Sequence, residues 1–125
     1  MAQVGQKPLI FHGAADRAFG YETGLHIASD HPEIDAAMTF NDLVALGMLA
    51  GLSQAGVAVG KDFHLVGFDD IEESSQSYPR LSSVRCDVNT FGLQTARLLL
   101  DWLENDLRPK NLKRFPVELV VRASS

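Results

Sequence analysis

Short apolar runs alternate with stretches of helical periodicity along most of the chain. The apolar runs, each short enough for a strand, lie at residues 8–12, 34–40, 62–68 and 81–86, and an alternating fifth run spans 115–122. Apolar residues recur at helical spacing at about 16–29, 43–55 and 89–104. Strands that alternate with helices are typical of an α/β fold. The sequence therefore predicts a mainly parallel sheet flanked by helices.

The clearest helical pattern covers residues 43–55. We expect Asp42 to be its N-cap, because a short acidic side chain can accept hydrogen bonds from the first backbone amides. Gly56 is expected to end it. In the preceding helix, Gly20 and Gly24 weaken the pattern, since glycine is a poor helix former.

Polar residues follow two of the predicted strands, Asn41-Asp42 after the first and Asp69-Asp70 after the second. In parallel α/β sheets, ligands bind in the crevice outside the carboxyl ends of the strands. Asn41 and Asp69 could hydrogen-bond a hydroxyl-rich ligand there, the carboxylate more strongly than a neutral group. His12, at the end of the run 8–12, is a further candidate for this cleft.

A simpler interpretation of the same residues is structural. Asn41 and Asp42 would only cap the helix that follows, and Asp69 and Asp70 would only begin a turn. Spacing alone favours this interpretation over ligand binding.

Other chemistry is not indicated. The acidic group at 69–73 lacks the spacing of a calcium loop, and the four histidines lack zinc spacing. No Gly-x-Ser-x-Gly motif occurs, and residues 56–60 do not form a phosphate loop. The sequence predicts neither an enzyme nor a metal or cofactor site.

Composition narrows the class of protein. A chain of 125 residues is one domain or a piece of one, and its net charge of −5 argues against a nucleic-acid-binding surface. Its single cysteine, Cys86, excludes an internal disulfide. No apolar run is long enough to span a membrane, and residues 1–7 do not resemble a signal peptide. We expect a soluble, cytoplasmic protein without a membrane partner.

Several stretches occur in the order and spacing of one known family. They are Asp-Ala-Ala-Met-Thr-Phe-Asn-Asp-Leu-Val-Ala-Leu-Gly at 35–47, Gly-Val-Ala-Val-Gly-Lys-Asp-Phe-His-Leu-Val-Gly-Phe-Asp-Asp at 56–70, Pro-Arg-Leu-Ser-Ser-Val at 79–84, Gly92, and Pro-Val-Glu-Leu-Val-Val-Arg-Ala-Ser at 116–124. With them, residues 34–125 resemble the C-terminal part of the effector-binding core of LacI/GalR-family bacterial transcription regulators. Residues 8–33 match only loosely, through Gly20-Tyr21.

The resemblance implies a core like that of type I periplasmic sugar-binding proteins, with two α/β subdomains and a small-molecule effector between them. It implies that Asn41 and Asp69 line the cleft with Phe68 beside it, and that the effector is a sugar or purine-like. It further implies a homodimer or larger assembly through the helix 43–55 and the loop 71–78. Operator DNA would be bound only through a headpiece that this chain lacks.

The resemblance also divides the chain. Residues 8–87 would be part of the C-terminal effector-binding subdomain, with 81–87 as a crossover. Residues 88–125 would belong largely to the partner subdomain, and residues 1–7 are expected to be disordered. By the same resemblance, Cys86 stands where many family members have a glutamine near the ligand.

Two alternatives remain open at this point. The nearest is a sugar-binding protein of a transport system, which would need an export signal. The other is a small α/β enzyme, which no cluster of residues supports.

Overall fold

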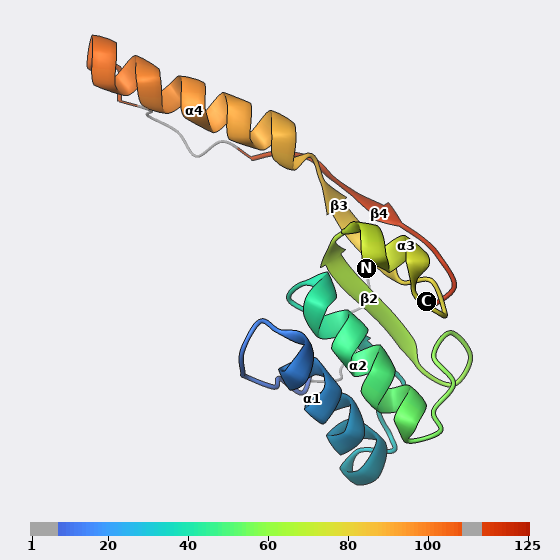
Figure 1. The fold of residues 1–125 in the computed structure, drawn as a ribbon. Coiled ribbons are helices and arrows are strands. Elements are labelled where there is room, and N and C mark those ends of the chain that lie inside the picture. The colour runs from blue at the N-terminus through green and yellow to red at the C-terminus, as the bar shows by residue number, and fades with distance from the viewer. Residues whose placement is uncertain (1–7, 109–113) are drawn as a thin grey trace, which may run out of the picture.

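The computed structural model describes residues 8–108 and 114–125. Its elements, in chain order, are α1 (Arg17–Asp30), β1 (Ala36–Met38), α2 (Asp42–Gln54), β2 (His64–Asp69), α3 (Glu72–Gln76), β3 (Ser82–Cys86), α4 (Val88–Asn105) and β4 (Val117–Val120). Figure 1 shows their arrangement. The prediction of disorder at residues 1–7 lies outside the described residues.

The predicted fold class is confirmed. The sheet has the order β1-β2-β3-β4, in which β1 and β3 pair with β2 in parallel and β4 pairs with β3 antiparallel. α1 packs against α2, and α2 packs against β2 (Figure 1). The three predicted helices are present within one or two residues of their expected ends, and the segment after β2 holds the short α3.

The strand predicted at 8–12 is absent. Residues 8–14 have no regular secondary structure, and the side chains of Leu9 and Ile10 are 54% and 65% exposed. Phe11 instead packs against the hydrophobic core and meets the rings of His26 and His31 edge-on, at centroid distances of 5.7 and 5.9 Å. An apolar run indicates burial, but a strand also needs a neighbouring strand to hydrogen-bond with, and none of the described strands takes that place.

The assignment of Asp42 as an N-cap is wrong by one residue. The N-cap of α2 is Asn41, whose side-chain oxygen accepts a hydrogen bond from the Val44 amide at 2.9 Å. Asp42 is the first helical residue, and its side chain is fully buried. The two neighbours are equivalent as capping residues in sequence, but only one of them has the extended backbone that a cap requires.

Glycines allow α1 and α2 to pack backbone against backbone. A Cβ at Gly47 would collide with the Arg17 carbonyl of α1, and one at Gly20 would collide with the Val44 carbonyl of α2. Gly24 and Gly51 lie one turn further along the same crossing. The glycines that weaken the helical pattern are therefore what brings the helices together.

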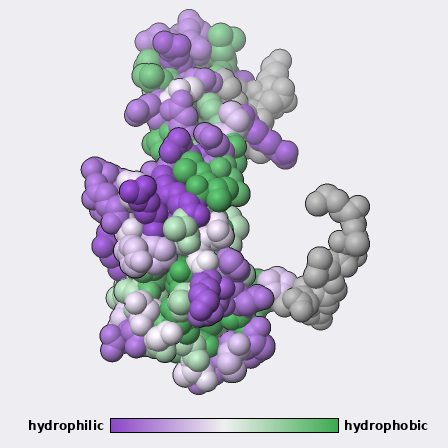
Figure 2. All heavy atoms as spheres, turned by 90° about the vertical axis from the view of Figure 1, so that its right-hand side faces the viewer, coloured by the Kyte–Doolittle hydropathy of each residue, from purple (hydrophilic) through white to green (hydrophobic). Residues whose placement is uncertain are grey.

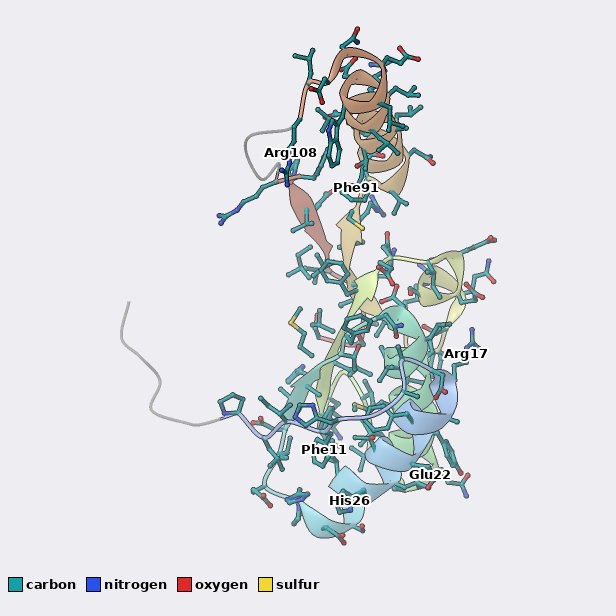
Figure 3. The ribbon with its side chains drawn as sticks, turned by 90° about the vertical axis from the view of Figure 1, so that its left-hand side faces the viewer. Phe11, Arg17, Glu22, His26, Phe91 and Arg108 are labelled. Carbon is teal, nitrogen blue, oxygen red and sulfur yellow. The ribbon has the colours of Figure 1, made fainter. Side chains whose placement is uncertain are left out.

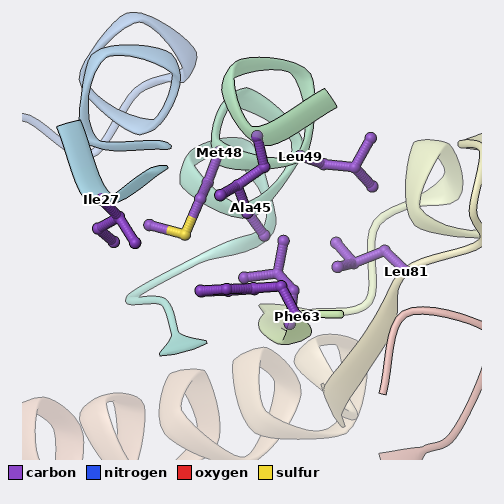
Figure 4. Packing of buried hydrophobic residues seen from close by; sticks show 8 residues of the cluster. Ile27, Ala45, Met48, Leu49, Phe63 and Leu81 are labelled. Carbon is purple, nitrogen blue, oxygen red and sulfur yellow. The ribbon is translucent and has the colours of Figure 1, made fainter. Parts of the chain in front are cut away.

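One apolar cluster fills the space between these helices and the sheet. Figure 4 shows its packing, with α1 contributing Ile27 and α2 contributing several side chains above the strands. Its buried members are Ile27, Ala45, Met48, Leu49, Leu52, Phe63, Leu65 and Leu81. The core thus lies within residues 27–81.

α4 stands away from this body, at the end of the two-stranded ribbon β3–β4 (Figure 1). None of its 18 residues is buried. Many large apolar side chains are exposed on it and just beyond it, namely Val88, Phe91, Leu93, Leu99, Leu100, Trp102, Leu103 and Leu107. Hydrophobic surface is correspondingly visible in the upper part of the molecule in Figure 2, and Figure 3 shows Phe91 and Arg108 far from the labelled residues of the lower body.

Candidate functional site

The carboxyl ends of β1 and β2 bring the predicted site residues to one edge of the sheet. Met38 is paired in register with Val66, and Asn41 and Asp69 each follow these partners by three positions. Because β1 and β2 are parallel neighbours, Asn41 and Asp69 both lie at the carboxyl edge of the sheet, as the sequence predicted for two neighbouring strand ends.

Asp69 and Asp70 share an uncommon backbone conformation. Their φ angles are +105° and +54°, a region that residues other than glycine seldom occupy. Hydrogen bonds fix the two residues after Asp69. The Asp70 amide donates to Ser83 Oγ at 3.1 Å, and the Ile71 amide donates to Asp42 Oδ2 at 2.9 Å. The turn after β2 is therefore held by hydrogen bonds to one side chain of β3 and one of α2.

Asp42 is the centre of these contacts. Its fully buried carboxylate also accepts hydrogen bonds from Ser74 Oγ at 2.7 Å and Ser83 Oγ at 2.6 Å. Three elements, α2, α3 and β3, thus meet at one carboxylate. A buried charge is tolerated where enough donors replace its lost water.

Asp70 is held by two arginines. Arg85 approaches its Oδ2 with Nη2 at 2.6 Å and Nε at 2.7 Å, and Arg122 Nη2 lies 2.7 Å from Oδ1. Burial opposes the charged form of Asp70, but hydrogen bonds and charge from Arg122 and Arg85 together outweigh it and lower its pKa. The turn is thereby tied to β3 through Arg85 and to the segment after β4 through Arg122.

Asp69 differs from both of its acidic neighbours. Its side chain is exposed, and among residues 8–108 and 114–125 no hydrogen bond or ion pair to its carboxylate is found. Partial desolvation, and after it the negative charge of Asp42, raise the pKa of Asp69. The chain thus presents one unpartnered carboxylate on a turn whose other groups are fixed.

Asn41 is already engaged in the structure. Besides capping α2 through Oδ1, it donates from Nδ2 to the Ala15 carbonyl at 3.2 Å. The capping interpretation is confirmed for Asn41, and any contact with a ligand would use the remaining lone pair of Oδ1 or replace the bond to Ala15.

The other two predicted site residues lie less centrally. Phe68 is half-buried in β2, in register with Val84 of β3. His12 is exposed in the irregular segment before α1. Sequence reasoning gave Asp42 only a capping role and missed Ser74, Ser83 and Arg122, because the partners of these residues are distant along the chain.

Two general features of the described residues bear on the class of site. Within 8–108 and 114–125, no three histidine, cysteine, aspartate or glutamate side chains gather as they would around a metal ion. Among the described helices, none combines the length and the apolar character that a membrane span requires. A hollow lined by residues of α1 and by Ala55 lies at the other ends of the helices, away from Asp69.

Comparison with known proteins adds the family context. Residues 2–125 match the family described as periplasmic binding protein-like domain. The lactose operon repressor of Escherichia coli K12 is 29% identical over 106 residues, which are 85% of this chain and 29% of that protein. The transcriptional regulator GalR of the same organism is 30% identical over 116 residues, covering 93% and 34% of the two chains.

Solved structures agree with these matches. A LacI-family regulator from Arthrobacter sp. FB24 in complex with lactose has a TM-score of 0.76 at 30% identity, over 89% of this chain and 42% of that one. The regulator CelR in complex with cellobiose has a TM-score of 0.84 at 26% identity, over 90% and 35%. A lac repressor dimer bound to operator and an anti-inducer has a TM-score of 0.81 at 28% identity, over 90% and 39%. The chain spans about a third of the length of the curated relatives that it matches.

Proposed function

Since the chain belongs to the periplasmic binding protein-like domain family, we propose that it is the effector-binding and dimerisation region of a LacI-type transcriptional regulator, a repressor that senses a sugar. The observation that carries this proposal is the unpartnered Asp69 carboxylate at the carboxyl edge of the sheet. The named relatives are transcription regulators, so the alternative role in transport is not favoured.

In this proposal, Asp69 accepts hydrogen bonds from sugar hydroxyls. An ionised carboxylate can accept from two neighbouring hydroxyls, and charge-assisted bonds of this kind are about twice as strong as neutral ones. Asn41 adds an amide at the same edge of the sheet, Phe68 lies beside them in β2, and His12 contributes from the segment before α1. Solved relatives in complex with lactose and cellobiose support a sugar over a purine.

The effector acts on a two-subdomain core. Residues 8–87 form part of one subdomain, and residues 88–125 belong largely to the other, which accounts for the apolar side chains that α4 exposes. An effector bound between the subdomains favours one of two conformations, and it changes operator affinity by as much as it distinguishes between them.

The proposed partners follow from the same assignment. The protein assembles as a homodimer through α2 and the segment 71–78, where Leu43 and Tyr78 are 37% and 94% exposed. In this proposal it acts in the cytoplasm, binds operator DNA through a separate headpiece and, like the named relatives, is a transcription regulator and not an enzyme.

A thermal-shift screen tests this function on the full-length gene product. Lactose, ribose, sucrose, cellobiose and purine bases are added in turn to the wild-type protein, Asp69→Ala and Asp62→Ala. A ligand at 100 times its Kd stabilises the native state by about 2.7 kcal/mol. We expect one sugar to raise the Tm of the wild type and of Asp62→Ala, which removes an exposed carboxylate from the other end of β2, but not that of Asp69→Ala.

Two results would overturn parts of the proposal. A sugar that stabilises Asp69→Ala as much as the wild type removes Asp69 from the site. No stabilisation by any compound in the panel contradicts the assignment of a sugar or purine effector. In a gel-shift assay with scrambled DNA as control, specific operator binding by the 125-residue chain alone would contradict the requirement for a headpiece.

A further inference from the structure

The carboxylate of Asp42 contacts the chain on both sides of Asp69. After Asp69, it accepts a hydrogen bond directly from the Ile71 amide. It is linked to the Asp70 amide through Ser83, whose Oγ accepts from Asp70 and donates to Asp42 Oδ1. Before Asp69, its Oδ1 lies against Gly67 so closely that a Cβ there would collide with it.

Ser83 is suited to this intermediate position. It is fully buried in β3, and its hydroxyl uses its proton toward Asp42 and a lone pair toward Asp70. Because the Ser83 side chain is fully buried, water cannot take the place of either partner. In such a buried network each member fixes the orientation of the next.

We propose that Asp42 and Ser83 are positioning residues for Asp69, which hold the turn in its positive-φ conformation and so present the Asp69 carboxylate at the edge of the sheet. The inference rests on the proposed function, in which Asp69 contacts the effector. A preorganised group loses less conformational freedom on binding than a mobile one, so this pair contributes to affinity without touching the ligand.

The charge of Asp42 gives this role a signature of its own. The pKa of Asp69 is raised by desolvation and by the negative charge of Asp42. Replacing Asp42 by asparagine keeps the size of the side chain but removes its charge and one acceptor oxygen, so the Asp69 carboxyl group should titrate at lower pH. Ser83 carries no charge, so its replacement tests the positioning of the turn separately from this charge effect.

The experiment follows the Asp69 carboxyl carbon by NMR during a pH titration of the full chain. The variants are Asp42→Asn, Ser83→Ala and, as a matched control, Thr23→Val. Thr23 is also a buried hydroxyl, 6% exposed, but it donates within α1 to the Phe19 carbonyl at 2.8 Å. We expect a lower pKa of Asp69 in Asp42→Asn, at least tenfold faster amide exchange of Asp70 in Ser83→Ala, and neither change in Thr23→Val.

The backbone chemical shifts of Asp69 provide a second measure if Asp42→Asn does not fold. In Ser83→Ala they should leave the values of a positive-φ residue, and the Kd for whichever panel sugar binds the wild type should rise about tenfold. Unchanged Asp69 shifts and an unchanged Asp70 exchange rate in Ser83→Ala would overturn the inference. This NMR result is independent of any sugar, whereas failure of every sugar to bind the wild type would count against the proposed function alone.

Discussion

Gly67 in β2 lies directly against the carboxylate of Asp42, with no space for a Cβ between them. The absence of a side chain at position 67 lets the first residue of α2 reach across to the turn after β2. This contact links a strand interior to the network beneath the candidate site, and it can be tested by adding a single methyl group.

Gly67→Ala should destabilise the protein by about 1–3 kcal/mol, the usual cost of overpacking a filled interior. Urea denaturation measures the change. Gly92→Ala is the control, because nothing lies within 4 Å of a Cβ at Gly92 and the residue is inside a helix. An alanine there favours helix by up to about 1 kcal/mol. Equal stabilities of Gly67→Ala and the wild type would contradict the close contact.

Gly47→Ala should separate the two packed helices. The added Cβ meets the Arg17 carbonyl, a backbone atom that cannot move without α1, so we expect a loss of about 1–3 kcal/mol and a lower Tm. Ser53→Ala on the exposed side of the same helix should change stability by less than about 0.5 kcal/mol. If the two variants melt alike, the backbone contact is not what limits the distance between α1 and α2.

Asp70 should make the stability depend on pH in the acid range. The pKa of Asp70 in the native protein lies below its ordinary value, which is also its pKa in the unfolded chain. Its ion pairs therefore contribute their full stabilisation above a pH of about 4 to 5. This contribution is lost as the pH falls from the unfolded-state pKa through the native pKa. Urea midpoints between pH 6 and pH 3 should therefore fall less steeply in Asp70→Asn than in the wild type.

The same substitution carries a cost at neutral pH. It leaves Arg122, whose side chain is 15% exposed, without its carboxylate, and removing one member of such a pair costs about 3 kcal/mol. Asp62→Asn removes an exposed carboxylate with no ion pair among the described residues, and it should keep the wild-type slope. A wild-type slope in Asp70→Asn would refute the prediction.

Asn41 combines a structural role with a proposed binding role, and two substitutions separate them. Asn41→Ala loses the cap of α2 and should lower stability by about 1 kcal/mol, whereas Asn41→Ser retains a capping oxygen and most of the stability. If Asn41 also binds the effector, the serine variant should melt near the wild type but bind the sugar more weakly. Wild-type affinity in Asn41→Ser would restrict Asn41 to its capping role.

Trp102 reports whether another part of the protein covers α4. It is the single tryptophan of the chain and is 41% exposed, with the Arg108 guanidinium 5.6 Å from its ring. Its fluorescence in the 125-residue chain should be quenched readily by acrylamide. In the full-length gene product, the emission that Trp102→Phe removes should lie at shorter wavelength and resist quenching. A Trp102 emission identical to that of the 125-residue chain would contradict the proposed two-subdomain arrangement.

The periodicity of apolar residues is sufficient to predict the helices and the strands that pair within the sheet. Runs such as 62–68 indicate a buried strand, and the structure forms β2 there. The run 8–12 has the same character, yet it forms no strand, because apolar composition indicates burial and says nothing of a hydrogen-bonding neighbour. Strand pairing is a non-local property, and no local pattern encodes it.

The role of Asp42 was hidden for a related reason. Its hydrogen-bond partners Ile71, Ser74 and Ser83 lie 29, 32 and 41 positions away, so the local sequence shows only an acidic residue at a helix start. Asn41 and Asp69 could be identified because strand ends are marked locally by the change from apolar to polar residues. The residues that hold the turn around Asp69 could not be identified in this way, because only the fold brings them together.

The length of α4 determines how far its free end lies from the β3–β4 ribbon. α4 has 18 residues and is therefore about 27 Å long. The β3–β4 ribbon joins it to the rest of the protein (Figure 1), and the ion pairs of Asp70 with Arg85 and Arg122 link this ribbon to the turn that carries Asp69. A rotation of α4 by about 10° about its junction with β3 would therefore move its far end by about 5 Å, close to the length of one helical turn.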